Sequence, residues 1–121
     1  MLDQHQSAAP GQLGDVTILR LSGELDTYRA PDARRAFADV AASGRAVVDL
    51  TEVPFIDSAG LGALIGGIRR IRERSGDVAV FGAQPQVCRM LRRTGVDRFV
   101  QLVSTLPEAI AALAHAGANR M

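Results

Sequence analysis

The 121-residue sequence contains no lysine and no tryptophan, and it has only one cysteine. All fourteen basic residues are therefore arginines, which face thirteen acidic residues and leave a net charge of +1. This balance gives no electrostatic reason to expect nucleic acid or an anionic membrane as a partner. Without lysine, the phosphate-binding loop G-x-x-x-x-G-K-[ST] is impossible. The lone Cys88 cannot form an intramolecular disulfide, which fits a reducing compartment.

Long apolar runs are also missing from the sequence. No run of about 18 apolar residues could span a bilayer, and the first fifteen residues lack the basic and apolar regions of a signal peptide. We therefore expect a cytoplasmic protein without direct membrane insertion. Composition and length are those of one globular domain. We expect this domain over residues 15–117, between an N-terminal segment (1–14) that is a flexible tail or a weak edge strand, and a C-terminal tail (118–121).

Short apolar segments alternate with amphipathic segments along the chain. Segments rich in β-branched and aliphatic residues predict strands at 16–21, 46–50, 78–81 and 99–103. Apolar residues at helical spacing predict helices at 30–43, 58–74 and 85–94, and a last helix is expected after Thr105, with Glu108 completing a capping box. Asp26 or Thr27 is expected to cap the first helix. This order predicts an α/β fold with a mostly parallel sheet and helices packed against it.

Ser58 stands where a loop enters the second predicted helix, directly after Asp57. Three roles for this serine remain open: the cap of the helix, a nucleophile, or a phosphoacceptor. A nucleophile is disfavoured because the pattern G-x-S-x-G is absent and both histidines, His5 and His115, lie near the chain ends. A phosphate is tolerated at a helix N-terminus, which offers free N–H groups and the positive end of the helix dipole.

An unusual number of small residues follows Ser58 in the predicted helix: Ala59, Gly60, Gly62, Ala63, Gly66 and Gly67. Each glycine costs about 1 kcal/mol of helix stability relative to alanine, so another interaction must compensate. Two interpretations remain open, tight packing against a neighbouring element or close approach of a partner protein. The glycine spacing does not match G-x-G-x-x-G and lies inside the helix, so nucleotide binding is disfavoured. We expect no cofactor and no metal ion.

Three motifs, in this order, resemble those of the STAS family, which is shared by sulphate transporters and anti-sigma factor antagonists. They are GELD at 23–26, VVDL at 47–50 and FIDSAGLG at 55–62, and the likeness extends from about Val16 to Leu113. The resemblance implies a small mixed, mostly parallel sheet of four or five strands, with about four helices mainly on one side. Two departures are visible: Ala59 occupies the position of the family's second serine, and the usual first strand is hard to find within residues 1–14.

The resemblance also implies a function, that of a stand-alone anti-sigma factor antagonist without enzymatic activity or catalytic residues. Such a protein binds an anti-sigma factor with serine kinase activity and frees the sigma factor, until the kinase phosphorylates the position of Ser58 and a serine phosphatase later resets it. An accessory subunit of a membrane transport ATPase, or part of a stress-sensing assembly, is the alternative. The expected partner-binding residues are Asp26, Thr27, Asp57, Ser58, Ala59, Gly60, Gly62, Ala63 and Gly66.

Overall fold

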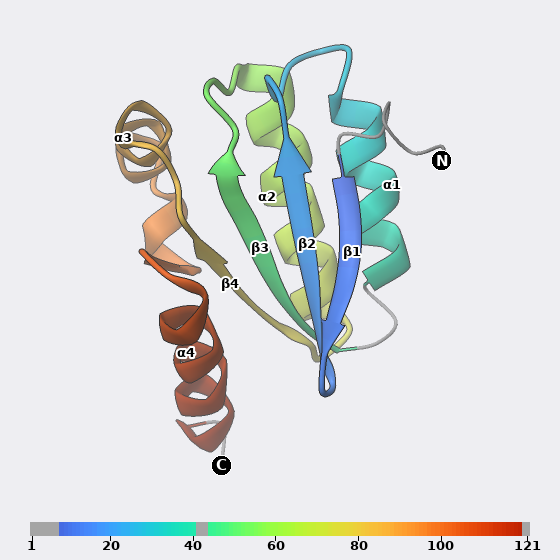
Figure 1. Ribbon diagram of the computed structural model, residues 1–121, viewed down its shortest axis with the longest axis vertical. Coiled ribbons are helices and arrows are strands. Elements are labelled where there is room, and N and C mark those ends of the chain that lie inside the picture. The colour runs from blue at the N-terminus through green and yellow to red at the C-terminus, as the bar shows by residue number, and fades with distance from the viewer. Residues whose placement is uncertain (1–7, 41–43, 120–121) are drawn as a thin grey trace.

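The computed structural model describes residues 8–40 and 44–119, and these residues form one five-stranded sheet (Figure 1). Its strands lie side by side in chain order: β1 (Ala8–Leu13), β2 (Val16–Ser22), β3 (Arg45–Glu52), β4 (Asp77–Phe81) and β5 (Gln101–Val103). The pairs from β2 to β5 are parallel, and only β1 runs antiparallel, at one edge. The predicted mixed, mostly parallel sheet is confirmed.

Helices cover both faces of this sheet unequally. The connections between the parallel strands contain α1 (Ala30–Val40), α2 (Ser58–Glu73), α3 (Pro85–Arg93) and a 3-10 turn (Val96–Arg98), and the chain ends with α4 (Leu106–Asn119). The first three helices share the larger apolar core, whereas α4 packs on the opposite face against β3, β4 and β5. Figure 1 shows α1 and α2 side by side behind the strands and α4 apart from them. The expected helices, mainly on one side, are confirmed.

The central strand β3 shows why this sequence folds into a covered parallel sheet. Its residues from Ala46 to Leu50 are all buried, as is typical of strands with helices on both faces. Val48 faces the core beneath α1 and α2, whereas its neighbour Val47 faces the smaller core beneath α4. The buried run of β3, in which only Asp49 is polar, therefore serves two cores, and the carboxyl end of the strand leads into the loop before α2.

The start of the last predicted strand differs from the structure by two residues. The strand expected at 99–103 begins only at Gln101, because the N–H groups of Phe99 and Val100 donate to the carbonyl of Val96 (3.1 and 3.2 Å) and so belong to the preceding turn. The helix expected at 30–43 is seen to Val40, and 41–43 lie outside the described residues. Within segment 1–14, β1 pairs with all of β2 except its last residue, from Ala8 opposite Leu21 to Leu13 opposite Val16.

Among the described residues, no helix is both long enough and apolar enough to cross a membrane.

Candidate functional site

Two loops meet at the carboxyl ends of β2 and β3, at the end of the molecule where α2 begins (Figure 1). Three backbone hydrogen bonds join them: the N–H of Gly23 donates to the carbonyl of Glu52 (2.9 Å), that of Leu25 to Phe55 (2.9 Å), and that of Asp57 to Leu25 (3.1 Å). The GELD and FIDSAGLG motifs, about thirty residues apart in the chain, therefore form one continuous surface.

Asp57 is the N-cap of α2. Its Oδ1 accepts a hydrogen bond from the N–H of Gly60 at 2.9 Å, which satisfies one of the otherwise free N–H groups of the first turn. Ser58 is the first residue of the helix and is exposed. The role of helix cap, one of three left open for Ser58, thus belongs to its neighbour, and the serine hydroxyl faces solvent at the positive end of the helix dipole.

The cap bond makes Asp57 a stability determinant of the site. We expect Asp57→Ala to lower the free energy of unfolding by about 1 kcal/mol, because Ala cannot accept the bond from the first turn. Asp57→Asn is the matched control, since an asparagine oxygen caps equally well. Urea denaturation followed by circular dichroism measures both. Equal losses in the two variants would show that the charge of Asp57, rather than its cap bond, stabilises α2.

Asp26 shapes the neighbouring loop in the same way. Its Oδ1 accepts from the N–H of Tyr28 (3.0 Å) and of Arg29 (3.1 Å), and its carbonyl accepts from Ala30 at the start of α1 (2.8 Å). Of the two residues expected to cap this helix, it is Asp26 that forms the bonds. Thr27 is exposed at the tip of the loop.

The small residues of α2 divide between the two interpretations. A Cβ at Gly60 would overlap the backbone carbonyl of Leu25, and one at Gly67 would overlap the ring of Phe37 on α1. Ala63, which lies between them along the helix, is 1% exposed. These three positions are required for tight packing.

Two further glycines of α2, Gly62 and Gly66, lie on its outer surface. A Cβ at either position would meet nothing within 4 Å, and both are exposed. Because they are four residues apart, they lie one above the other on the helix. Within the expected partner-binding set, Gly60 and Ala63 are buried, whereas Ser58, Gly62 and Gly66 are exposed and Ala59 is partly exposed.

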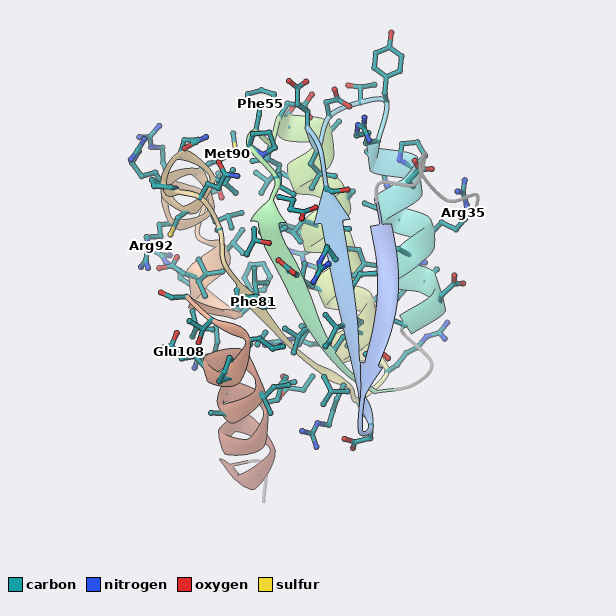
Figure 2. All side chains as sticks on the ribbon, in the orientation of Figure 1. Arg35, Phe55, Phe81, Met90, Arg92 and Glu108 are labelled. Carbon is teal, nitrogen blue, oxygen red and sulfur yellow. The ribbon has the colours of Figure 1, made fainter. Side chains whose placement is uncertain are left out.

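Two aromatic side chains are exposed on the same two loops. Tyr28 is 91% exposed and Phe55 is 50% exposed, and they are the large hydrophobic residues most open to solvent in the described part of the chain. Figure 2 shows Phe55 at the end of the molecule where α2 begins. Phe55 was not among the predicted site residues, and the one signal for it was its place in the FIDSAGLG motif, two residues before the cap.

The two loops are also acidic. Segments 22–29 and 51–58 carry four carboxylates and one guanidinium, contributed by Glu24, Asp26, Glu52, Asp57 and Arg29. At pH 7 this surface has an excess of negative charge around Ser58, in a chain whose overall charge is +1.

No histidine side chain is found in the part of the chain that the structure describes. His5 lies outside the described residues, and so does the side chain of His115. Searched over the same residues, no group of three His, Cys, Asp or Glu side chains could hold a metal ion. The described geometry presents the exposed Ser58 beside two exposed aromatic residues on an acidic surface.

Comparisons with known proteins point to one family. The family model described as "STAS domain" matches residues 8–109. The "Anti-sigma F factor antagonist" of Paenibacillus polymyxa is 33% identical over 102 residues, which cover 81% of this chain and 86% of the relative. The "Anti-sigma-B factor antagonist" of Listeria monocytogenes is 31% identical over 84 residues, covering 68% of this chain and 74% of the relative. The crystal structure of an anti-sigma factor antagonist from Mycobacterium paratuberculosis superposes with a TM-score of 0.79 at 28% identity, covering 93% of this chain and 99% of that one.

Proposed function

The chain belongs to the STAS domain family, and from this premise we propose that it is an anti-sigma factor antagonist switched by phosphorylation of Ser58. The unphosphorylated chain binds an anti-sigma factor that has serine kinase activity, and the sigma factor is thereby released. Phosphorylation of Ser58 by that kinase weakens the complex, and a serine phosphatase restores the binding form. The chain acts by binding rather than as an enzyme, in the cytoplasm where sigma factors work.

One observation carries this proposal: α2 begins with an exposed serine, and glycines leave the adjacent outer surface of the helix without side chains. Ser58 is the first residue of α2, and Gly62 and Gly66 follow it on the same helix with no atoms above them. A partner can therefore approach the helix backbone closely and reach the hydroxyl at the same time. Because these two glycines are not needed for internal packing, close approach of a partner is the remaining explanation for their cost to helix stability.

The chemistry of a phosphoserine fits this position. A phosphate adds about −1.5 to −2 charges at pH 7, and the N-terminal end of α2 accepts negative charge without unfolding. The new charge joins a surface that already carries Asp26 and Asp57. A partner that tolerates the neutral serine then meets both added bulk and a larger negative potential. Binding is altered while the fold is kept.

The names of the relatives support the identity of the partner. Proteins called antagonists of anti-sigma factors align with more than two thirds of this chain, through the segment that contains Ser58. We therefore take an anti-sigma factor as the binding partner of this chain too.

The test is a phosphorylation assay with the anti-sigma factor that co-purifies with the unphosphorylated chain. With ATP present, we expect one phosphate on Ser58 by mass spectrometry, and no phosphate on Ser58→Ala. The matched control is Thr27→Ala, which removes an exposed hydroxyl from the adjacent loop and should leave labelling intact. Labelling of Ser58→Ala would contradict the proposed acceptor. Co-purification with a transport permease and its ATPase would contradict the proposed role.

A further inference from the structure

A cleft of about 430 Å³ lies at the opposite end of the sheet from Ser58. It exists because β5 is shorter than β4. The ladder between them begins at Ala79 opposite Gln101, so the first residues of β4, Asp77 and Val78, extend beyond the end of β5. The last turn of α2, the 3-10 turn and α4 close around this gap. The volume falls within the range of about 300–1,000 Å³ that small-molecule sites occupy.

The polar lining of the cleft has an excess of guanidinium groups. Among the described residues, Arg72, Arg92 and Arg98 line it together with two carboxylates, Asp77 and Asp97. Arg72 Nη2 lies 3.7 Å from Asp77 Oδ1, and Arg92 Nη1 lies 3.9 Å from Asp97 Oδ2. Both ion pairs are long, and no such pair within the described residues includes Arg98. One positive charge of the lining is therefore left uncompensated.

Arg72 also has a donor that is not used. Its Nε atom is buried and has no hydrogen-bond partner among the groups that the structure describes. Buried donors in native proteins are nearly always paired, with protein, water or an ion. A guanidinium presents several N–H donors in one plane, which match the oxygens of a carboxylate or a phosphate. The Arg72 side chain is 35% exposed through its other atoms, and these together with the unpaired charge of Arg98 are suited to the same kind of ligand, an oxyanion.

Apolar side chains form a smaller part of the lining, from Val78, Ala79, Phe99, Val100, Leu102 and Ala112. Three of them, Phe99, Leu102 and Ala112, are partly exposed, and the other three are buried. Guanidinium groups beside a few partly exposed apolar side chains match an anion that carries a small apolar body, since binding sites combine apolar contacts with a few oriented polar groups. From this lining we propose that the cleft binds a small organic anion, either a carboxylate or a phosphate ester on an apolar body. The ligand's oxyanion lies against Arg72 and Arg98.

This site is separate from the surface around Ser58. Ser58 begins α2, and Arg72 stands in its last turn, so about 21 Å of helix lies between them at 1.5 Å per residue. Figure 2 shows Arg92 projecting from α3 on the side of the molecule away from α1. Binding in the cleft does not depend on the proposed anti-sigma factor antagonism and can be tested on the chain alone.

Four probes separate charge from apolar body in an NMR titration of the ¹⁵N-labelled chain. Phenyl phosphate and benzoate carry both features, inorganic phosphate carries only the charge, and benzyl alcohol carries only the apolar body. We expect saturable shifts at the amides of Ala79, Gln101 and Leu102 with phenyl phosphate or benzoate, and weaker binding of the other two probes. Whichever of phenyl phosphate and benzoate binds more tightly identifies the oxyanion.

Arginine substitutions locate the contact. We expect Arg98→Gln to weaken binding of the preferred probe about tenfold, as for the loss of a hydrogen bond to a charged group. The matched control is Arg89→Gln, an exposed arginine of α3 outside the lining, which should leave the affinity unchanged. The amide signals of residues outside the cleft, compared with those of the native chain, show whether each variant is folded.

Three outcomes would overturn the proposal. Absence of saturable shifts with every probe would remove the site. Equal affinity for benzyl alcohol and phenyl phosphate would show that the guanidinium groups do not contribute to binding. Equal weakening by Arg98→Gln and Arg89→Gln would reduce the effect to the net charge of the protein.

Discussion

Gly60→Ala is expected to destabilise the protein by about 3 kcal/mol, the upper end of the range for overpacking substitutions. The added Cβ would overlap the carbonyl oxygen of Leu25 and would lie 2.7 Å from its carbonyl carbon. These are backbone atoms, so no change of side-chain rotamer relieves the overlap. The same carbonyl accepts the hydrogen bond from Asp57 that joins the two loops (3.1 Å). Moving Leu25 away would therefore break a hydrogen bond that joins the GELD loop to the start of α2.

The matched control is two residues away in the same helix. Gly62→Ala adds the same methyl group where no atom lies within 4 Å, so only the better helix propensity of alanine remains, and we expect a gain of up to about 1 kcal/mol. Urea denaturation measures both free energies of unfolding. In thermal unfolding, the midpoint temperatures of the two variants should differ by roughly 10 °C or more. Similar stabilities of the two variants would contradict the division of the glycines into packed and exposed positions.

The glycines mark the limit of what the sequence predicts about α2. The helix itself was predictable from Leu64, Ile68 and Ile71, which follow the helical period and are all buried. The number of glycines also indicated an unusual helix. Their separate roles were not predictable, because these depend on what lies opposite each position. Phe37 lies opposite Gly67 only after α1 has packed against α2.

The same physical limit applies to the candidate site. The GELD and FIDSAGLG motifs indicated where it lies. Thr105 was predicted as a cap, and Asp26 was one of two candidates with Thr27, because such side chains act within a few residues. Whether Asp57 or Ser58 caps α2 was not predictable, since both residue types are good caps. The exposure of Phe55 was equally unpredictable from the sequence. The adjacent apolar residue, Ile56, is the one that is buried, and it pairs with Leu25 only where the two loops meet.

Ser58→Glu is expected to weaken the complex with the anti-sigma factor at least about thirtyfold, or about 2 kcal/mol at 1.4 kcal/mol per factor of ten. This expectation rests on the proposed function. The substitution places a permanent negative charge at the first residue of α2, beside Asp57 and on a loop surface with four carboxylates and one guanidinium. A charge covered by a partner that lacks a matching cation loses its hydration without compensation, which is costly.

Ser58→Gln separates the effect of charge from that of bulk, because glutamine has nearly the size of glutamate and no charge. Isothermal titration calorimetry with the co-purifying anti-sigma factor gives the three affinities. If charge is decisive, Ser58→Gln binds nearly as well as the native chain, and the loss with Ser58→Glu shrinks as salt is raised and screens the repulsion. If Ser58→Gln is as weak as Ser58→Glu at every salt concentration, the phosphate excludes the partner by its size above the bare surface at Gly62 and Gly66. Undiminished binding of both variants would contradict any switch at Ser58, because neither the bulk nor the charge that a phosphate brings would then be felt by the partner.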